Sequence, residues 1–159
     1  MGTEGKLEVG HEAPRFSLPA SDGSTVSLND YLGKKRIVLY FYPKDDTPGC
    51  TKEACSFRDW RKEIEKHDAV VFGLSADSLK SHEKFVNKYQ LNFPLLSDVD
   101  HQVAEAYGAW GEKAMYGKKY FGMIRKTFII GKDGKILYAN HKVQADGHAE
   151  EILAVLEKL

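Results

Sequence analysis

The sequence predicts an α/β fold in which a mixed central sheet is covered by helices on both faces. Residues 36–42 and 70–76 are nearly continuous apolar runs of strand length, which is typical of strands buried on both sides. About one helix length separates them, so they form a β-α-β unit with parallel strands. Asp22-Gly23 and Asp133-Gly134 are hairpin turn signals, which add antiparallel strands. Parallel and antiparallel pairs together make the sheet mixed.

Composition is that of a globular protein. The chain has 159 residues, of which 42% are hydrophobic and 29% are charged, enough to close a core without disulfide bonds. It contains no internal repeat and no linker-like tract. We therefore expect one domain over residues 1–159, with residues 1–7 as a flexible lead.

The charge balance and the N-terminus restrict the partners. Twenty-three basic residues offset 23 acidic ones with no dense basic run, so nucleic acid is not expected as a partner. The N-terminus lacks the apolar core of a signal peptide, and no stretch approaches the roughly 18 apolar residues of a membrane span. We expect no membrane association and a cytoplasmic location. Thiols are kept reduced there, which favours a catalytic, redox-sensing or metal-binding role for a close cysteine pair.

The first half of the chain is predicted element by element. Residues 15–28 form an N-terminal β-hairpin around Asp22-Gly23, and the strand at 36–42 follows. A helix then runs from Cys50 to about residue 66 and leads to the strand at 70–76. The next helix is capped by Asp77 or Ser78 and ends near residue 92. Four of its residues recur at helical spacing: Leu79, His82, Val86 and Tyr89.

The second half begins with a short strand at 94–97 and a short helix at 101–107. Residues 108–124 are rich in Gly and Tyr, and we predict an ordered surface loop in which Trp110, Tyr116 and Tyr120 pack. Strands at 126–130 and 135–140 flank Asp133-Gly134. Apolar residues at helical spacing mark a closing amphipathic helix: Ala149, Ile152, Leu153 and Leu156.

The only two cysteines, Cys50 and Cys55, lie in the segment "FYPKDDTPGCTKEACSF". On the predicted helix, Cys50 shares the inward face with Ala54 and Phe57, whereas Cys55 is about 140° further round, nearer the polar side. The unpaired N–H groups and partial positive charge of a helix N-terminus favour a thiolate. Cys50 is therefore the predicted nucleophile. Cys55 lacks this help and is predicted to attack whatever Cys50 becomes.

The spacing of the two cysteines predicts a conformational change. Two Cα atoms five residues apart in an ideal helix are separated by about 8.7 Å. Disulfide bonds rarely span more than about 7 Å. A bond between Cys50 and Cys55 therefore requires the first turns of the helix to unwind, over residues 47 to about 57.

The cysteine pair also has simpler interpretations. A buried cysteine is often only a small apolar residue. A structural zinc site needs four ligands, and none of the six histidines is near the pair in sequence. Four residues separate the cysteines, which excludes a C-x-x-C dithiol motif.

Two motifs carry a family resemblance. "PKDDTPGC" has a P-x-x-x-T-x-x-C arrangement, and together with Cys55 it resembles the peroxiredoxins of the bacterioferritin-comigratory, or Q-type, branch. The stretch "WGEKAMYGKKYFGMIRKTFII" resembles the same branch, and the likeness covers nearly the whole chain. The resemblance implies a thioredoxin-like fold, hydrogen peroxide or alkyl hydroperoxide as substrate, and thioredoxin or a similar dithiol as reductant. It implies no metal, flavin or haem.

The resemblance also implies roles for individual residues. Cys50 would become a sulfenic acid on reaction with peroxide, and Cys55 would then form an intramolecular disulfide with it. Thr47 would orient thiolate and peroxide, Pro43 would shield the sulfur, and Arg125 would favour the thiolate and the charge developing on oxygen. Because the disulfide lies within one chain, a monomer is expected.

Each of these residues also has a plainer interpretation. Thr47 could be only a helix cap, Pro43 only the end of a strand, and Arg125 only a solvated surface charge. Glu53 shares the family's position, but a carboxylate in the first turn of a helix is ordinary dipole complementarity. The alternatives for the whole protein are a redox sensor whose disulfide toggles a partner surface, and a non-catalytic thioredoxin-fold binding or holdase module.

Overall fold

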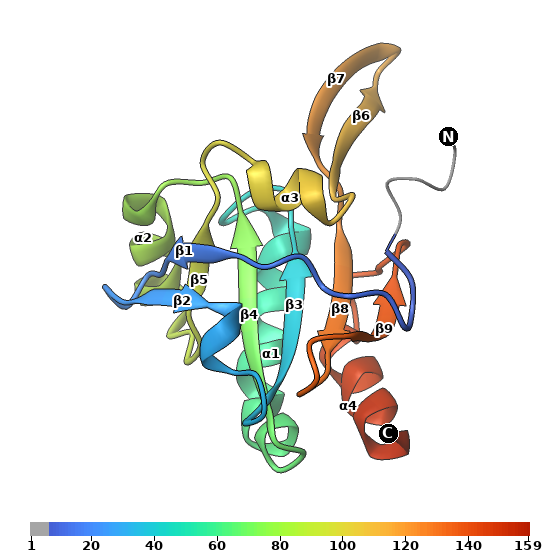
Figure 1. Ribbon diagram of the computed structural model, residues 1–159. Coiled ribbons are helices and arrows are strands. Elements are labelled where there is room, and N and C mark those ends of the chain that lie inside the picture. Colours follow the sequence, from blue (N-terminus) through green and yellow to red (C-terminus); the bar gives the residue numbers. More distant parts are fainter. Residues whose placement is uncertain (1–6) are drawn as a thin grey trace.

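A five-stranded mixed sheet forms the centre of the protein, which was analysed as a computed structural model describing residues 7–159 (Figure 1). The strand order is β5-β4-β3-β8-β9. The bounds are β3 (Arg36–Phe41), β4 (Ala69–Ser75), β5 (Leu95–Ser97), β8 (Lys126–Ile130) and β9 (Ile136–Asn140). Strands β3, β4 and β5 are parallel, whereas β8 is antiparallel to β3 and to β9. The predicted mixed sheet is confirmed. The predicted flexible lead falls almost entirely on residues 1–6, outside the described residues.

Strand β3 is apolar and buried from Ile37 to its end at Phe41. Ile37, Leu39 and Phe41 point into one core, and Val38 and Tyr40 point into the core on the opposite face. Successive side chains alternate between the faces of a sheet, so a strand covered on both sides needs apolar residues at every position.

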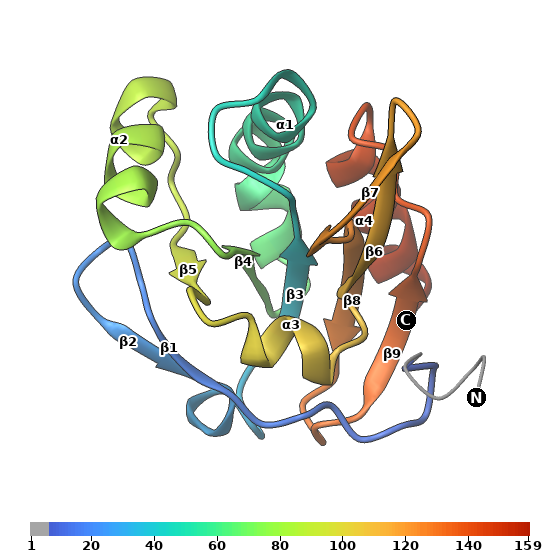
Figure 2. The same ribbon diagram turned by 90° about the horizontal axis from the view of Figure 1, so that it is seen from above.

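Helices cover both faces, as predicted (Figure 2). One face carries α1 (Pro48–Glu65), α2 (Leu79–Tyr89) and α4 (His148–Lys158). The other carries α3 (Gln102–Ala106) and the predicted N-terminal hairpin, formed by β1 (Ser17–Pro19) and β2 (Thr25–Ser27), which leads into the short 3-10 helix η1 (Leu28–Asp30). Within residues 7–159, no helix combines the length and the apolar character that crossing a membrane requires.

Helix α1 begins earlier than predicted. It starts at Pro48, with Thr47 as the N-cap residue, so Cys50 is its third residue and not its first. Proline is favoured at the first helical position because its missing N–H would be unpaired there anyway. For α2, the N-cap is Ser78, whose side chain accepts a hydrogen bond from the Ser81 N–H.

The prediction of a surface loop at residues 108–124 is wrong. Most of this stretch forms a hairpin of β6 (Trp110–Met115) and β7 (Lys118–Met123), which projects beyond the end of the sheet (Figure 1). Tyr116 and Gly117 at its turn both have positive φ, 53° and 79°, as in a type I′ turn. Trp110 packs against His101 as expected of a packing residue, but Tyr116 is 97% exposed. Glycine is uncommon in strands, so the glycines of this stretch led to the prediction of a loop.

Candidate active site

Cys50 lies just past the carboxyl end of β3, in the first turn of α1. Its side chain is buried in the same core as Ala54 and Phe57, on the inward face of the helix. The first N–H groups of a helix have no partner within it, so the start of α1 favours negative charge at this position. The location therefore suits a thiolate that is screened from bulk water.

Arg125 reaches Cys50 from the other side. It immediately precedes β8, and because β8 pairs antiparallel with β3, the start of β8 lies beside the end of β3. Its Nη2 donates a hydrogen bond to Cys50 Sγ at 3.2 Å, and its Nη1 donates to Glu53 Oε1. The side chain is only 19% exposed, so it is not the solvated surface charge of the plainer interpretation.

Gly49 allows this close approach. A Cβ atom at Gly49 would lie 3.4 Å from Arg125 Nη2, tighter than most contacts of this kind. Burial disfavours the charge of Arg125, but the neighbouring Glu53 and Cys50 raise its pKa above the ordinary value. The guanidinium therefore stays positive beside the sulfur, where it can stabilise negative charge on sulfur or on a bound oxygen.

Glu53 is part of the site, contrary to the sequence interpretation. We expected a carboxylate that only complements the helix dipole, yet its side chain is fully buried. Burial raises its pKa to about 7, while Arg125 acts in the opposite direction. The sequence does carry a signal for this burial, because Glu53 is three residues after Cys50 and therefore lies on the same inward face as Ala54 and Phe57.

His148 was missed by the sequence analysis. It is the first residue of α4, is buried, and has its Nε2 2.7 Å from Thr127 Oγ1 and 3.8 Å from Glu53 Oε2. Burial lowers its pKa to about 4. The imidazole is therefore neutral at pH 7. A single histidine at the start of a predicted helix gives no sequence signal that it will pack beside Glu53.

Thr47 and Pro43 lie on the turn that leads from β3 into α1. Thr47 is the N-cap residue, but its Oγ1 donates to the carbonyl oxygen of Lys44 at 2.9 Å and caps no helix N–H. Pro43 is half-buried and follows the end of β3. Both residues thus belong to one short turn, and the side chain of Thr47 closes it.

Cys55 is separated from Cys50 by more than one turn of α1. Both cysteines are free thiols, Cys50 buried and Cys55 half-buried. Because both lie within α1, the ideal-helix separation of about 8.7 Å applies to them. The structure brings Cys50, Arg125 and Glu53 together and leaves Cys55 beyond disulfide reach in the intact helix.

Lys113 is a second cation near the site that the sequence analysis did not identify. Its ammonium donates to the carbonyl oxygen of Met123 at 2.8 Å, and its stem passes over Gly122, where a Cβ atom would lie 3.4 Å from it. Burial and the charge of Arg125 lower the pKa of Lys113, whereas Cys50 raises it. The ammonium is therefore within electrostatic reach of the sulfur.

Comparison with known proteins agrees with this geometry. A sequence model of the AhpC/TSA family matches residues 9–139. A putative peroxiredoxin bcp of Coxiella burnetii is 51% identical over 94% of this chain and 99% of its own length, and peroxiredoxin Bcp of Bacillus subtilis is 46% identical over 96% and 97%.

A solved structure also has a similar fold. The bacterioferritin comigratory protein of Xanthomonas campestris, studied for alkyl peroxide reduction, superposes with a TM-score of 0.87 at 37% identity over 95% of this chain and 98% of its own. The chain thus shares its fold with that protein along nearly its full length.

Proposed function

This chain belongs to the AhpC/TSA family of peroxiredoxins, and from that premise we propose that it reduces hydrogen peroxide and alkyl hydroperoxides through Cys50. The observation that carries the proposal is the hydrogen bond of 3.2 Å from Arg125 to the buried sulfur at the start of α1. The alkyl peroxide reduction studied in the Xanthomonas protein supports the substrate class.

In the first step, the Cys50 thiolate attacks the terminal oxygen of the hydroperoxide, the one that carries the proton. An S–O bond forms, the O–O bond breaks, and sulfur supplies the two electrons. The departing oxygen takes the proton of the attacked oxygen and leaves as water or alcohol, so Cys50 becomes a sulfenic acid after protonation. Arg125 stabilises the developing negative charge. Thr47 orients the peroxide and Pro43 shields the sulfur from water.

In the second and third steps the sulfenic acid is recycled. The Cys55 thiolate attacks the sulfur of Cys50, the S–S bond forms, and the hydroxyl leaves with a proton as water. The first turns of α1 must unwind for this step, given the helical separation. A dithiol protein such as thioredoxin then reopens the bond by two thiol exchanges. Both cysteines lie in one chain, so the cycle needs no second subunit, and we propose a monomer.

The test is stopped-flow oxidation of the reduced protein by hydrogen peroxide, followed by mass analysis. We expect a disulfide between Cys50 and Cys55. Cys50→Ser should abolish peroxide consumption, whereas Cys55→Ser should keep the first oxidation and stop at the sulfenic acid. Thioredoxin-dependent turnover by Cys50→Ser would refute the proposal. Fast oxidation followed by slow reduction by thioredoxin would identify a redox sensor instead.

A further inference from the structure

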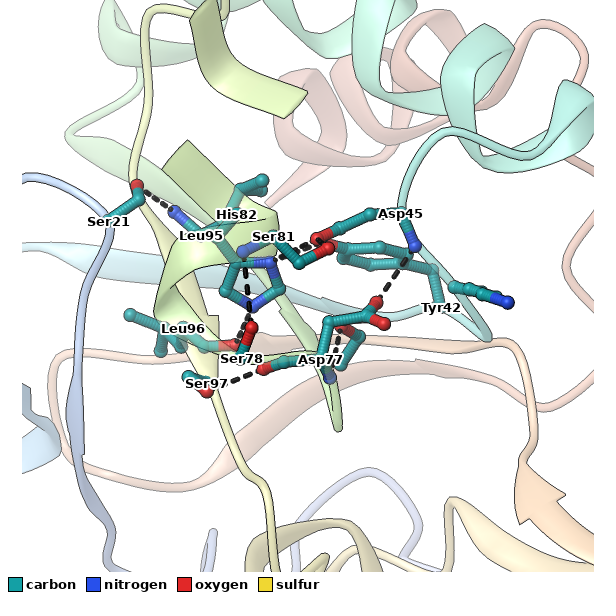
Figure 3. A network of polar contacts seen from close by, with 12 residues as sticks. Ser21, Tyr42, Asp45, Asp77, Ser78, Ser81, His82, Leu95, Leu96 and Ser97 are labelled. Atoms are coloured by element: carbon teal, nitrogen blue, oxygen red, sulfur yellow. Dashed lines mark hydrogen bonds and ion pairs between the residues drawn. The ribbon is translucent and has the colours of Figure 1, made fainter. Parts of the chain in front are cut away.

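A buried polar network ties the turn before Cys50 to the neighbouring helix α2 (Figure 3). The carboxylate of Asp45 accepts hydrogen bonds from the hydroxyls of Tyr42 at 2.5 Å and Ser81 at 2.8 Å. It also lies 2.7 Å from Nδ1 of His82, while the Asp45 N–H donates to Asp77 at 2.8 Å. Asp45 and His82 are both buried. The proposed peroxide chemistry makes no use of these groups.

The network encloses a proton between Asp45 and His82. Nε2 of His82 lies 2.9 Å from the carbonyl oxygen of Leu96, which can only accept, so Nε2 carries a hydrogen. A neutral ring would then present the lone pair of Nδ1 to a carboxylate oxygen 2.7 Å away. Two acceptors do not hold this distance, so a proton lies between them. A hydrogen bond therefore joins Nδ1 of His82 to the Asp45 carboxyl group inside the buried network.

The same atoms could be mistaken for a metal site. Ligand atoms of Asp45, Asp77 and His82 lie within 4.8 Å of one another. Each of these residues, however, already has hydrogen-bond partners in the protein: Asp77 accepts from the hydroxyl of Ser75 at 2.7 Å as well as from the Asp45 N–H. The arrangement is complete without an ion.

The turn needs this anchoring because its backbone is strained. Asp46 has φ of 57°, which is unfavourable for a residue with a side chain and persists only where the surroundings hold it. At the surface, the Asp46 carboxylate accepts hydrogen bonds from Lys88 and Tyr89, both at 2.8 Å. The strained turn lies between Pro43 and Thr47, the two residues assigned to the peroxide. Its geometry therefore decides where those residues stand.

We propose that Asp45 and His82 are positioning residues for the peroxide step, holding the turn of residues 43–47 in its reactive arrangement from α2. This inference rests on the proposed function of Cys50. The side-chain partners of Asp45 come from the end of β3 and from residues 77–82, and none comes from α1. The turn is therefore held whether or not α1 is intact.

The test separates reaction with peroxide from general reactivity of the thiol. The rate constants for oxidation of Cys50 by hydrogen peroxide and for its alkylation by iodoacetamide are measured in Asp45→Asn and His82→Leu. We expect peroxide oxidation to fall about ten- to a hundredfold, as for a displaced orienting group. Alkylation should stay within about twofold, because Arg125 and α1 still hold the sulfur. The double variant should be no slower than the slower single one.

Three further variants keep the test decisive. Lys88→Ala removes one exposed contact between the same turn and α2 and leaves the hydrogen bond from Tyr89 to Asp46 in place, so both rates should stay unchanged within about twofold. His82→Asn retains a donor near the position of Nδ1 and should recover part of the peroxide rate. If the buried variants fail to fold, Ser81→Ala decides: it removes one donor to Asp45 and should slow only the peroxide reaction, by about threefold.

Two results would overturn the proposal. One is a parallel fall of the peroxide and alkylation rates, which would mean that the network only stabilises the fold. The other is an unchanged peroxide rate in the folded variants. Failure of the proposed function is distinguishable from both, because wild-type protein would then not be oxidised at Cys50 at all.

Discussion

The chain before Cys50 and the chain after it are held in different ways. Before it, the buried side chain of Asp45 has a partner at both carboxylate oxygens. Where the start of α1 meets α4, in contrast, Oε2 of Glu53 and Nδ1 of His148 are both buried without a hydrogen-bond partner within the described residues. The contact between α1 and α4 includes a long hydrogen bond of 3.3 Å from Ala149 N–H to Ser56 Oγ.

This difference indicates which half of the site can open. Burying a polar atom without a partner costs about 1–3 kcal/mol, so unwinding the start of α1 regains hydration there. Releasing the turn before Cys50 would instead break the hydrogen bonds of the buried Asp45 side chain. We therefore propose that the site combines a fixed turn with a helix start that can unwind.

The largest effect that would test this contrast is in hydrogen exchange. On formation of the disulfide, amides of residues 51–57 should lose protection by at least about a hundredfold, because the helix must unwind. The amide of Asp45, which donates to Asp77, should keep its protection. Mass spectrometry or NMR of reduced and oxidised protein measures both. Oxidised Cys55→Ser, which forms no disulfide, is the control and should resemble reduced protein.

Either of two results would break the contrast. Equal loss of protection at Asp45 would show that the turn opens with the helix. Unchanged protection of residues 51–57 would show that the disulfide forms without unwinding.

A second, smaller effect is the pH dependence of this opening. The pKa of His148 is lowered by burial from 6.5 to about 4, so an opened α1 binds a proton there between these values, and acid favours opening. The pKa of Glu53 is raised by burial from 4.5 to about 7, so opening releases a proton from it, and acid opposes opening. The two effects have opposite signs between pH 4.5 and 6.5 and should largely cancel in the wild type.

Single variants should show the pH dependence due to His148 and that due to Glu53 separately. In Glu53→Gln, opening measured by hydrogen exchange should become easier as pH falls from 6.5 to 4.5. In His148→Gln, it should become easier as pH rises from 4.5 to 7. Each full shift corresponds to at most on the order of 3 kcal/mol. Opening that stays independent of pH in Glu53→Gln would show that His148 remains buried when α1 unwinds.

The sequence predicted what depends on neighbours along the chain. Apolar runs located the sheet, and the spacing around Cys50 put it on the inward face of a helix, because period and polarity reflect local burial. Asp45 and His82, in contrast, are 37 residues apart and meet only when α2 packs beside the turn. The helical spacing of His82 within α2 is visible in the sequence, yet nothing local shows which carboxylate it would face.

The hairpin of β6 and β7 escaped prediction for a related reason. Its glycines and polar residues do not resemble a buried strand, since the hairpin projects from the body and has little core to face. Register alone settles which side chains share a side: Lys113 is paired with Tyr120, and Lys119 with Ala114 on the opposite side. Only the folded structure shows that Lys113 interacts electrostatically with Cys50.

The smallest predicted effect concerns the contribution of this hairpin to the reactivity of Cys50. Lys113→Met removes a partly buried positive charge that acts on the thiolate, so oxidation by peroxide and alkylation by iodoacetamide should both slow by about two- to fivefold. Lys119→Met is the matched control: it removes an exposed lysine from the next pair, on the opposite side, and should change neither rate. Both rates are measured by stopped flow at low and moderate salt.

An equal fall of the two rates would indicate that the charge of Lys113 acts on the sulfur itself. Misplacement of the turn, in contrast, would slow only the reaction with peroxide. If Lys113→Met slowed peroxide oxidation alone, the hairpin would act on the bound peroxide and not on the thiolate.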